Sequence, residues 1–296
     1  MDKMKITRYG IWLLTVLSTL YSLTGCTRRD LLEGSDKVPF KIMLDWGTYS
    51  KPLATGYLFY DDKGSAPLYL EGTADGFEGY LLPGIYRIGI FNTDPVNASL
   101  QNNGNHEDDC FVANGWQSRS TPDIIESVSN VYGTGITEVT IPRSAVEPIV
   151  QKAKPVELVR RVTYILDVGS VGGIKSLEVY QGGAIIDKRI VSNKPYTGNS
   201  AALLRKALLN KDGFFETQLS VFDFVGPCQL TITATFEDGT TASTTPIDMT
   251  EDLINQPEDD ITINLVLQLE DINDEVKAAV KIHGWKTGGS GEIIIQ

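Results

Sequence analysis

The chain has 296 residues, enough for about two domains of ordinary size. It contains 26 Lys and Arg against 38 Asp and Glu, for a net charge of -12. That balance argues against a nucleic-acid binder, because such proteins present a basic face to phosphates. Two His and three Cys leave little material for a zinc site or a disulfide scaffold. These limits favour an acidic, globular and non-catalytic protein.

The N-terminal segment has the layout of a secretory signal. Lys3, Lys5 and Arg8 give it a positive start. Residues 11–23 are mostly apolar, but this stretch is shorter than the ~20 residues that a membrane-spanning helix needs. The segment therefore predicts export across a membrane.

A four-residue motif follows the apolar stretch directly. Leu23–Cys26 reads Leu-Thr-Gly-Cys and resembles the bacterial lipobox. The resemblance implies cleavage between Gly25 and Cys26, loss of the signal peptide 1–25, and attachment of palmitate and other acyl chains to Cys26. Two or more acyl chains hold a protein on a bilayer almost irreversibly. The alternative is an ordinary secretory signal in which this Cys occurs by chance.

The lipobox predicts where the protein resides. Residues 26–37 are polar and are expected to form a flexible tether between the lipid and the body. Asp30, Glu33 and Asp36 resemble the acidic tracts that direct some lipoproteins outward, although Arg28 and Arg29 interrupt them. We expect a lipid-anchored protein of the cell outer membrane, exposed at the surface.

From residue 38 onward the dominant hydrophobic period is two, as in β-strands. Alternating stretches are separated by turn-forming residues and divide at a break between Pro142 and Pro155. This pattern predicts an all-β protein with minor helix, built as two tandem antiparallel β-sandwich domains at 38–150 and 151–296. No sequence repeat links the two parts.

Two segments depart from the strand pattern. Residues 94–135 lack periodicity and predict a long surface excursion, with a short helix near 122–129. Ser200–Leu209 is rich in helix formers with apolar residues at helical spacing, which predicts a helix.

Few residues point to chemistry. His106–Cys110 reads His-Glu-Asp-Asp-Cys, yet its spacing matches no metal-binding motif. We interpret it as a polar loop, with weak calcium binding as the alternative. No nucleophile elbow, phosphate-binding loop or dinucleotide motif is present. We therefore predict no catalytic residue, no metal and no cofactor, although a hydrolase site assembled only in three dimensions stays open.

The remaining candidates have structural explanations. Cys110 and Cys228 are interpreted as two separate buried thiols, with a disulfide between them as the alternative. A group of aromatic residues at strand spacing is interpreted as core, with a sugar-stacking platform as the alternative. The group consists of Trp46, Tyr57, Phe59, Tyr60, Tyr86 and Phe91.

Two motifs of the body carry a family resemblance. Residues 82–92 contain Pro-Gly-x-Tyr followed by a strand that ends at Asn92, and Thr140–Pro142 reads Thr-Ile-Pro. Behind a lipobox and a polar tether, this order is similar to Bacteroidetes lipoproteins of the fimbrillin superfamily, near the fimbrial anchor and minor subunits. The resemblance implies two transthyretin-like β-sandwiches in tandem.

The same resemblance implies a function. Such proteins anchor or assemble a fimbria at the outer membrane, by strand addition in which one subunit completes another's open sheet edge. Ile293, Ile294 and Ile295 form the possible donor strand, and the alternative is the last core strand of the second domain. We expect a non-enzymatic fimbrial anchor or accessory subunit that acts in cell-surface assembly and adhesion. The alternative is an outer-membrane lipoprotein that binds a glycan or a partner protein.

Overall fold

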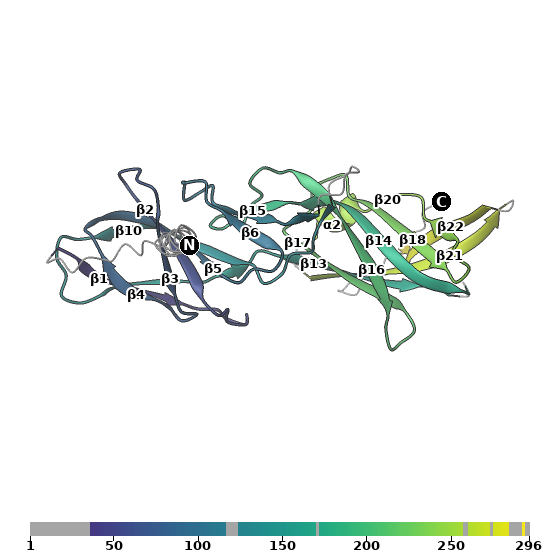
Figure 1. Ribbon diagram of the computed structural model, residues 1–296, viewed down its shortest axis with the longest axis horizontal. Helices are drawn as coiled ribbons and strands as arrows, with labels where there is room; N and C mark the ends of the chain where they lie inside the picture. The colour runs from purple at the N-terminus through teal and green to yellow at the C-terminus, as the bar shows by residue number, and fades with distance from the viewer. Residues whose placement is uncertain are drawn as a thin grey trace, which may run out of the picture.

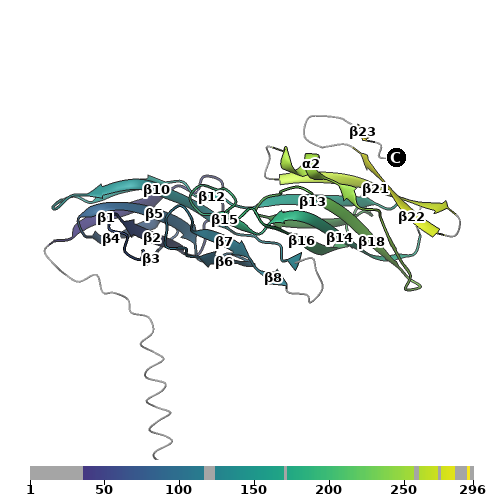
Figure 2. The same ribbon diagram turned by 90° about the horizontal axis from the view of Figure 1, so that it is seen from above.

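The structure is a computed structural model that describes residues 36–116, 124–169, 172–256, 260–272, 275–283 and 292–293. The described part is elongated, with the N-terminal half at one end and the C-terminal half at the other (Figures 1 and 2). Its regular elements are strands except for one short helix, α2 (Thr250–Ile254). The predicted all-β class is confirmed.

In the N-terminal half (residues 38–157), two sheets enclose a core. The smaller sheet has the order β11 (Ile149–Ala153), β1 (Val38–Leu44) and β4 (Gly76–Leu81). The larger sheet has the order β12 (Val156–Glu157), β10 (Tyr132–Ile141), β5 (Gly84–Asn92), β2 (Thr55–Asp61) and β3 (Leu68–Gly72).

Apolar residues at every second position explain which face of β1 is buried. Val38, Phe40 and Ile42 are at most 1% exposed, and they pack with Tyr57 and Phe59 of β2. By contrast β2 is buried almost throughout, because its two faces meet different partners. Tyr57 and Phe59 face the core between the two sheets, whereas Leu58 and Tyr60 join the larger core that continues into the C-terminal half.

The C-terminal half (residues 160–293) is built on one large sheet. Its main path runs β19 (Thr241–Ser243), β18 (Gln229–Phe236), β14 (Ile174–Ile185), β16 (Ser200–Leu209), β17 (Phe215–Val221), β13 (Arg160–Asp167), β21 (Asp260–Ile272), β22 (Glu275–His283) and β23 (Glu292–Ile293). Three short strands join it from the side: β20 (Ile247–Asp248), β8 (Gly115–Trp116) and β9 (Ile124–Ile125).

The two halves share one pairing scheme, although their sequences show no repeat. In each half the first strand pairs antiparallel with a later strand, β4 for β1 and β17 for β13. The same strand pairs in parallel with a strand near the end of its half, β11 or β21. The second strand of the N-terminal half, β2, lies between β3 and β5. Likewise, β14 of the C-terminal half lies between β16 and β18. The halves therefore repeat a topology that their side-chain patterns do not reveal.

A fourth sheet, of three short strands, joins the halves. Its order is β15 (Asp187–Arg189), β7 (Cys110–Ala113) and β6 (Ala98–Gln101), so a strand of the C-terminal half pairs with one of the N-terminal half. Past residue 150, β11 and β12 still pair with β1 and β10. The division into domains at residue 150 stays a prediction.

The structure corrects both predicted helices. Ser200–Leu209 is strand β16, hydrogen-bonded to β14 along most of its length and to β17 at its end. Helix propensities differ by only a few tenths of a kcal/mol per residue, so pairing on two sides outweighs them. Of the predicted helix near 122–129, residues 124–129 are described, and they form β9 and a loop.

The expected surface excursion at 94–135 is also wrong for its described part. Phe111, Val128 and Val131 from this segment are at most 1% exposed and belong to the larger core. The segment lies where the two halves meet, so its apolar residues are buried by both. A segment without periodicity can still be buried when its neighbours differ from residue to residue.

Candidate functional site

The first candidate feature is the place of β1 in its sheet. Residues 38–43 of β1 pair with β4, and residues 40–44 pair with β11. The strand is therefore held by hydrogen bonds along both edges, and its apolar face lies in the core. Whatever is attached to the chain ahead of Val38 is joined directly to a central, buried strand.

The site residues that the sequence predicts lie mainly outside the described residues. Gly25 and Cys26 of the lipobox are not among them, nor are Ile294 and Ile295 of the possible donor strand. The backbone of Ile293 belongs to β23, which pairs with β22 at one end of the large sheet. The lipid anchor and the donor strand stay predictions.

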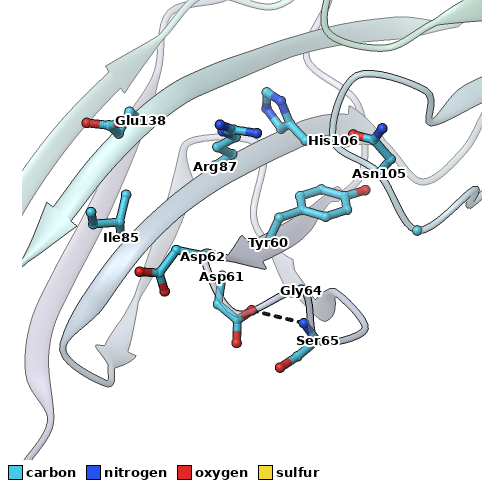
Figure 3. Close-up of a pocket in the computed structure, with 11 residues that line it drawn as sticks. Tyr60, Asp61, Asp62, Gly64, Ser65, Ile85, Arg87, Asn105, His106 and Glu138 are labelled. Carbon is cyan, nitrogen blue, oxygen red and sulfur yellow. Dashed lines mark hydrogen bonds between the residues drawn. The ribbon is translucent and has the colours of Figure 1, made fainter.

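The second candidate feature is a pocket of about 380 Å³ on the N-terminal half (Figure 3). It lies where the end of β2 and the turn after it meet β5, β10 and the loop at 104–106. Most of its lining side chains carry a polar group, and one is aliphatic. The lining residues are Tyr60, Asp61, Asp62, Gly64, Ser65, Ile85, Arg87, Gly104, Asn105, His106 and Glu138.

A β-bulge supplies one wall of this pocket. Tyr86 pairs with Val139 and Ile88 pairs with Ile136, so two residues of β10 lie opposite Arg87 alone. A bulge redirects side chains that regular alternation would send to the other face. Glu138 is one of these two residues, and it faces the same hollow as Arg87 (Figure 3).

His106 closes the inner end of the pocket. It is 4% exposed, its Nε2 lies 3.3 Å from the backbone oxygen of Ile88, and its ring meets that of Tyr60 edge to face at 5.6 Å. Burial lowers the pKa of His106 and outweighs the hydrogen bond to Ile88, which raises it. The imidazole is therefore neutral near pH 7, and Nε2 carries the proton that it donates to Ile88.

Several polar groups of the pocket are not engaged by the chain. The Tyr60 side chain is 7% exposed, and its buried hydroxyl has no hydrogen-bond partner. That hydroxyl points toward Asn105 (Figure 3). Within the described part of the chain, Arg87, Asp62 and Glu138 form no ion pair within 4 Å. Asp61 differs, because its Oδ1 accepts the backbone N–H groups of Lys63 and Ser65 at 3.1 Å.

The other sequence candidates are structural. Cys110 and Cys228 are both buried and free, which confirms two separate thiols. In the described residues, no group of three His, Cys, Asp or Glu side chains is placed to hold a metal ion. His106 and Asp109, expected in a solvated loop, are at most 4% exposed. The Asp109 carboxylate accepts the backbone N–H of Asn103 at 2.7 Å and thereby holds the loop together.

The aromatic group is core, as expected. Five of its six members are at most 7% exposed: Trp46, Tyr57, Phe59, Tyr60 and Phe91. Tyr86 is half-buried, and its hydroxyl donates to the backbone oxygen of Leu82 at 3.1 Å. The sugar-stacking platform is therefore wrong for this group, because buried rings offer no face on which a sugar could stack.

Sequence reasoning missed the pocket. Asp61, Asp62 and Glu138 belong to no motif, and Arg87 lies in the stretch 82–92 without being part of its Pro-Gly-x-Tyr motif. The pocket forms only when β5, β10 and the loop at 104–106 come together. The one signal available is Tyr60, a tyrosine at the end of an apolar and aromatic run, directly before Asp61.

Comparison with known proteins places these features in context. No family model matches the chain. A Bacteroides ovatus protein named as a candidate fimbrium anchoring subunit, Fim4B, is 28% identical over 188 residues, covering 58% of this chain and 55% of that protein. The chain thus matches about half of the length of this relative. The similarity to fimbrial anchor proteins that the sequence indicates is confirmed.

Two solved structures resemble the whole described body. A candidate adhesin from Bacteroides ovatus aligns with a TM-score of 0.63 at 16% identity, covering 86% of this chain and 96% of that chain. The fimbrial anchor protein Mfa2 of Porphyromonas gingivalis aligns with a TM-score of 0.58 at 13% identity, covering 84% and 98%. The chain has the fold of these two proteins. Among the described residues, no helix has the length and apolar character that crossing a bilayer requires.

Proposed function

We propose that this chain is a non-enzymatic accessory subunit of a fimbria, which anchors the assembly to the cell outer membrane through lipidated Cys26. The observation that carries the proposal is the central position of β1, the first strand after the lipobox and tether. The similarity to a fimbrium anchoring subunit supports the same role.

The geometry of β1 suits an anchor. Hydrogen bonds between strands run nearly perpendicular to the strand direction. A pull on the tether acts along β1, so it loads the bonds to β4 and β11 together. It must also drag Phe40 and Ile42 out of the core. A strand held on one edge only would resist the same pull with one ladder of hydrogen bonds instead of two.

The anchor is tested by replacing Cys26. We expect Cys26→Ala to lose labelling by a palmitate analogue and to move from the membrane to the soluble fraction, together with the fimbrial material. Cys110→Ala is the control, because it removes a buried cysteine away from the lipobox. Palmitate labelling that survives in Cys26→Ala would disprove the lipid anchor.

The fimbrial role is tested separately. Envelope extracts are run on a denaturing gel, boiled and unboiled, and probed with an antibody. Strand exchange between subunits predicts a ladder that collapses on boiling, since the exchanged strand is held by a whole sheet. A single monomer band under both conditions would contradict the fimbrial role and favour binding of a glycan or a partner protein.

We also propose that Ile293, Ile294 and Ile295 donate a strand to a neighbouring subunit. The support is the edge position of β23, which pairs only with β22 among the described strands. Deletion of residues 292–296 should then abolish the ladder and leave membrane attachment intact. A ladder that persists in the deletion variant would assign these residues to the chain's own sheet.

A further inference from the structure

The pocket of Figure 3 contains a buried hydroxyl without a partner. Tyr60 is 7% exposed, and its Oη has no hydrogen bond. Buried polar groups in native proteins are nearly always satisfied, by the chain, by water or by a ligand. The hydroxyl oxygen is closed off from solvent and points toward Asn105, another lining residue, so a group bound in the pocket meets it once the Asn105 side chain moves aside.

The pocket also presents donors and acceptors together. Arg87 supplies N–H donors, while Asp62 and Glu138 supply carboxylate acceptors, and none of the three is joined in an ion pair to another described residue. They surround a hollow of about 380 Å³, within the size range of small-molecule sites. A ligand that uses this arrangement must both donate and accept hydrogen bonds at several positions.

The charges of the lining residues restrict the chemical class of the ligand. Asp61, Asp62 and Glu138 outnumber Arg87, so an anionic ligand is repelled overall. A simple cation would leave the Arg87 donors unused. A neutral molecule with several hydroxyl groups meets both requirements, because each hydroxyl is a donor and an acceptor.

We propose that this pocket binds one neutral pyranose unit of a glycan. Hydroxyl groups of the sugar donate to Asp62 and Glu138 and accept from Arg87, and one of them pairs with the Tyr60 hydroxyl. Ile85, the one aliphatic side chain of the lining, faces an apolar C–H surface of the ring. This inference does not depend on the lipid anchor or on strand exchange.

The proposal is tested with the full chain on an array of neutral oligosaccharides, namely glucans, mannans and galactans, and acidic ones, namely polygalacturonate and heparin. Saturation-transfer NMR with the monosaccharide units of the best binder follows. We expect binding to a neutral saccharide, and at least a tenfold loss of affinity in Tyr60→Phe and in Arg87→Gln. Tyr60→Phe removes a hydroxyl that forms no hydrogen bond in the fold. The midpoint of thermal unfolding of this variant should therefore not fall below that of the parent chain.

Matched controls separate binding from folding. Tyr57→Phe removes a buried tyrosine hydroxyl outside the pocket, one that accepts a hydrogen bond from Thr55 at 2.9 Å. Lys41→Gln removes an exposed cation outside the pocket. Both should bind as the parent chain does. The proposal fails if no neutral saccharide binds, if only acidic ones bind, or if Tyr60→Phe and Arg87→Gln bind unchanged. Release from the membrane in Cys26→Ala should leave saccharide binding intact.

Discussion

Arg160 and Asp223 form an ion pair beside the junction of the two halves, with Nη1 of Arg160 2.9 Å from Oδ1 of Asp223. The Arg160 side chain is 8% exposed, and its Nη2 also donates to the backbone oxygen of Gln256 at 2.9 Å. Lys188 of the joining sheet places Nζ 4.0 Å from Oδ2 of the same carboxylate and is 6% exposed. One carboxylate thus faces two buried cations.

Asp223→Ala should therefore lower the free energy of unfolding by about 2–4 kcal/mol, because it removes a carboxylate that faces two buried cations. Glu78→Ala is the control, since its pair with Lys41 is solvent-exposed and is expected to contribute less than about 1 kcal/mol. Urea unfolding of both variants measures the difference. Equal effects would show that Asp223 adds no more than a surface charge does.

Gly76 is the position where β4 most closely approaches β1. Its φ is +140°, and a Cβ there would lie 1.9 Å from the backbone oxygen of Ile42. Gly76→Ala should cost about 3 kcal/mol or more, because both strain and a clash with backbone must be relieved. Gly64→Ala is the control: its φ is +72° and nothing lies within 4 Å, so about 1 kcal/mol of strain is expected. Thermal unfolding that ranks the two variants in the opposite order would contradict the pairing of β1 with β4.

The two buried thiols should be unreactive. Burial raises the pKa of both Cys110 and Cys228 to about 11, so the reactive thiolate is scarce at pH 8 and inaccessible as well. In Cys26→Ala, where these are the only cysteines, a thiol reagent should label neither residue in the native state and both in guanidinium chloride. Rapid native labelling would place a thiol at the surface.

His106 should make stability depend on pH. Burial lowers its pKa in the folded state, whereas in the unfolded chain it titrates near ~6.5. The unfolded state then binds more protons below that pH, so stability is lost as the pH falls, by at most about 1.4 kcal/mol per pH unit. Guanidinium midpoints between pH 5 and 8 should show this slope in the parent chain and a flatter one in His106→Gln. His283→Gln, which changes the only other histidine, should keep the parent slope.

Much of the fold can be predicted from the alternation of apolar and polar residues along the chain. The alternation of apolar residues in 260–269 and 85–92 predicts strands, and these residues lie in β21 and β5. Alternation is reliable here because successive side chains of a strand point to opposite faces, so one buried face imposes a period of two. The lipobox is equally local, since its meaning depends only on neighbouring residues.

Ser200–Leu209 shows where local reasoning fails. Its helix formers favour a helix in isolation, but β14 and β17 offer it hydrogen bonds on both sides. The prediction for residues 94–135 fails for a similar reason. The apolar side chains of this segment are buried where the two halves meet, and the residues that cover them are far apart in sequence.

By itself, then, the sequence determined the strand-rich class, the expected lipid attachment at Cys26 and the absence of a recognisable catalytic motif. Only the tertiary structure decided that β1 is central, that the halves repeat one pairing scheme, and that Tyr60, Arg87 and Glu138 share a pocket. The physical reason is distance along the chain. A local period sets which way a side chain points, whereas strand order, a β-bulge and the placing of a loop set which side chains meet.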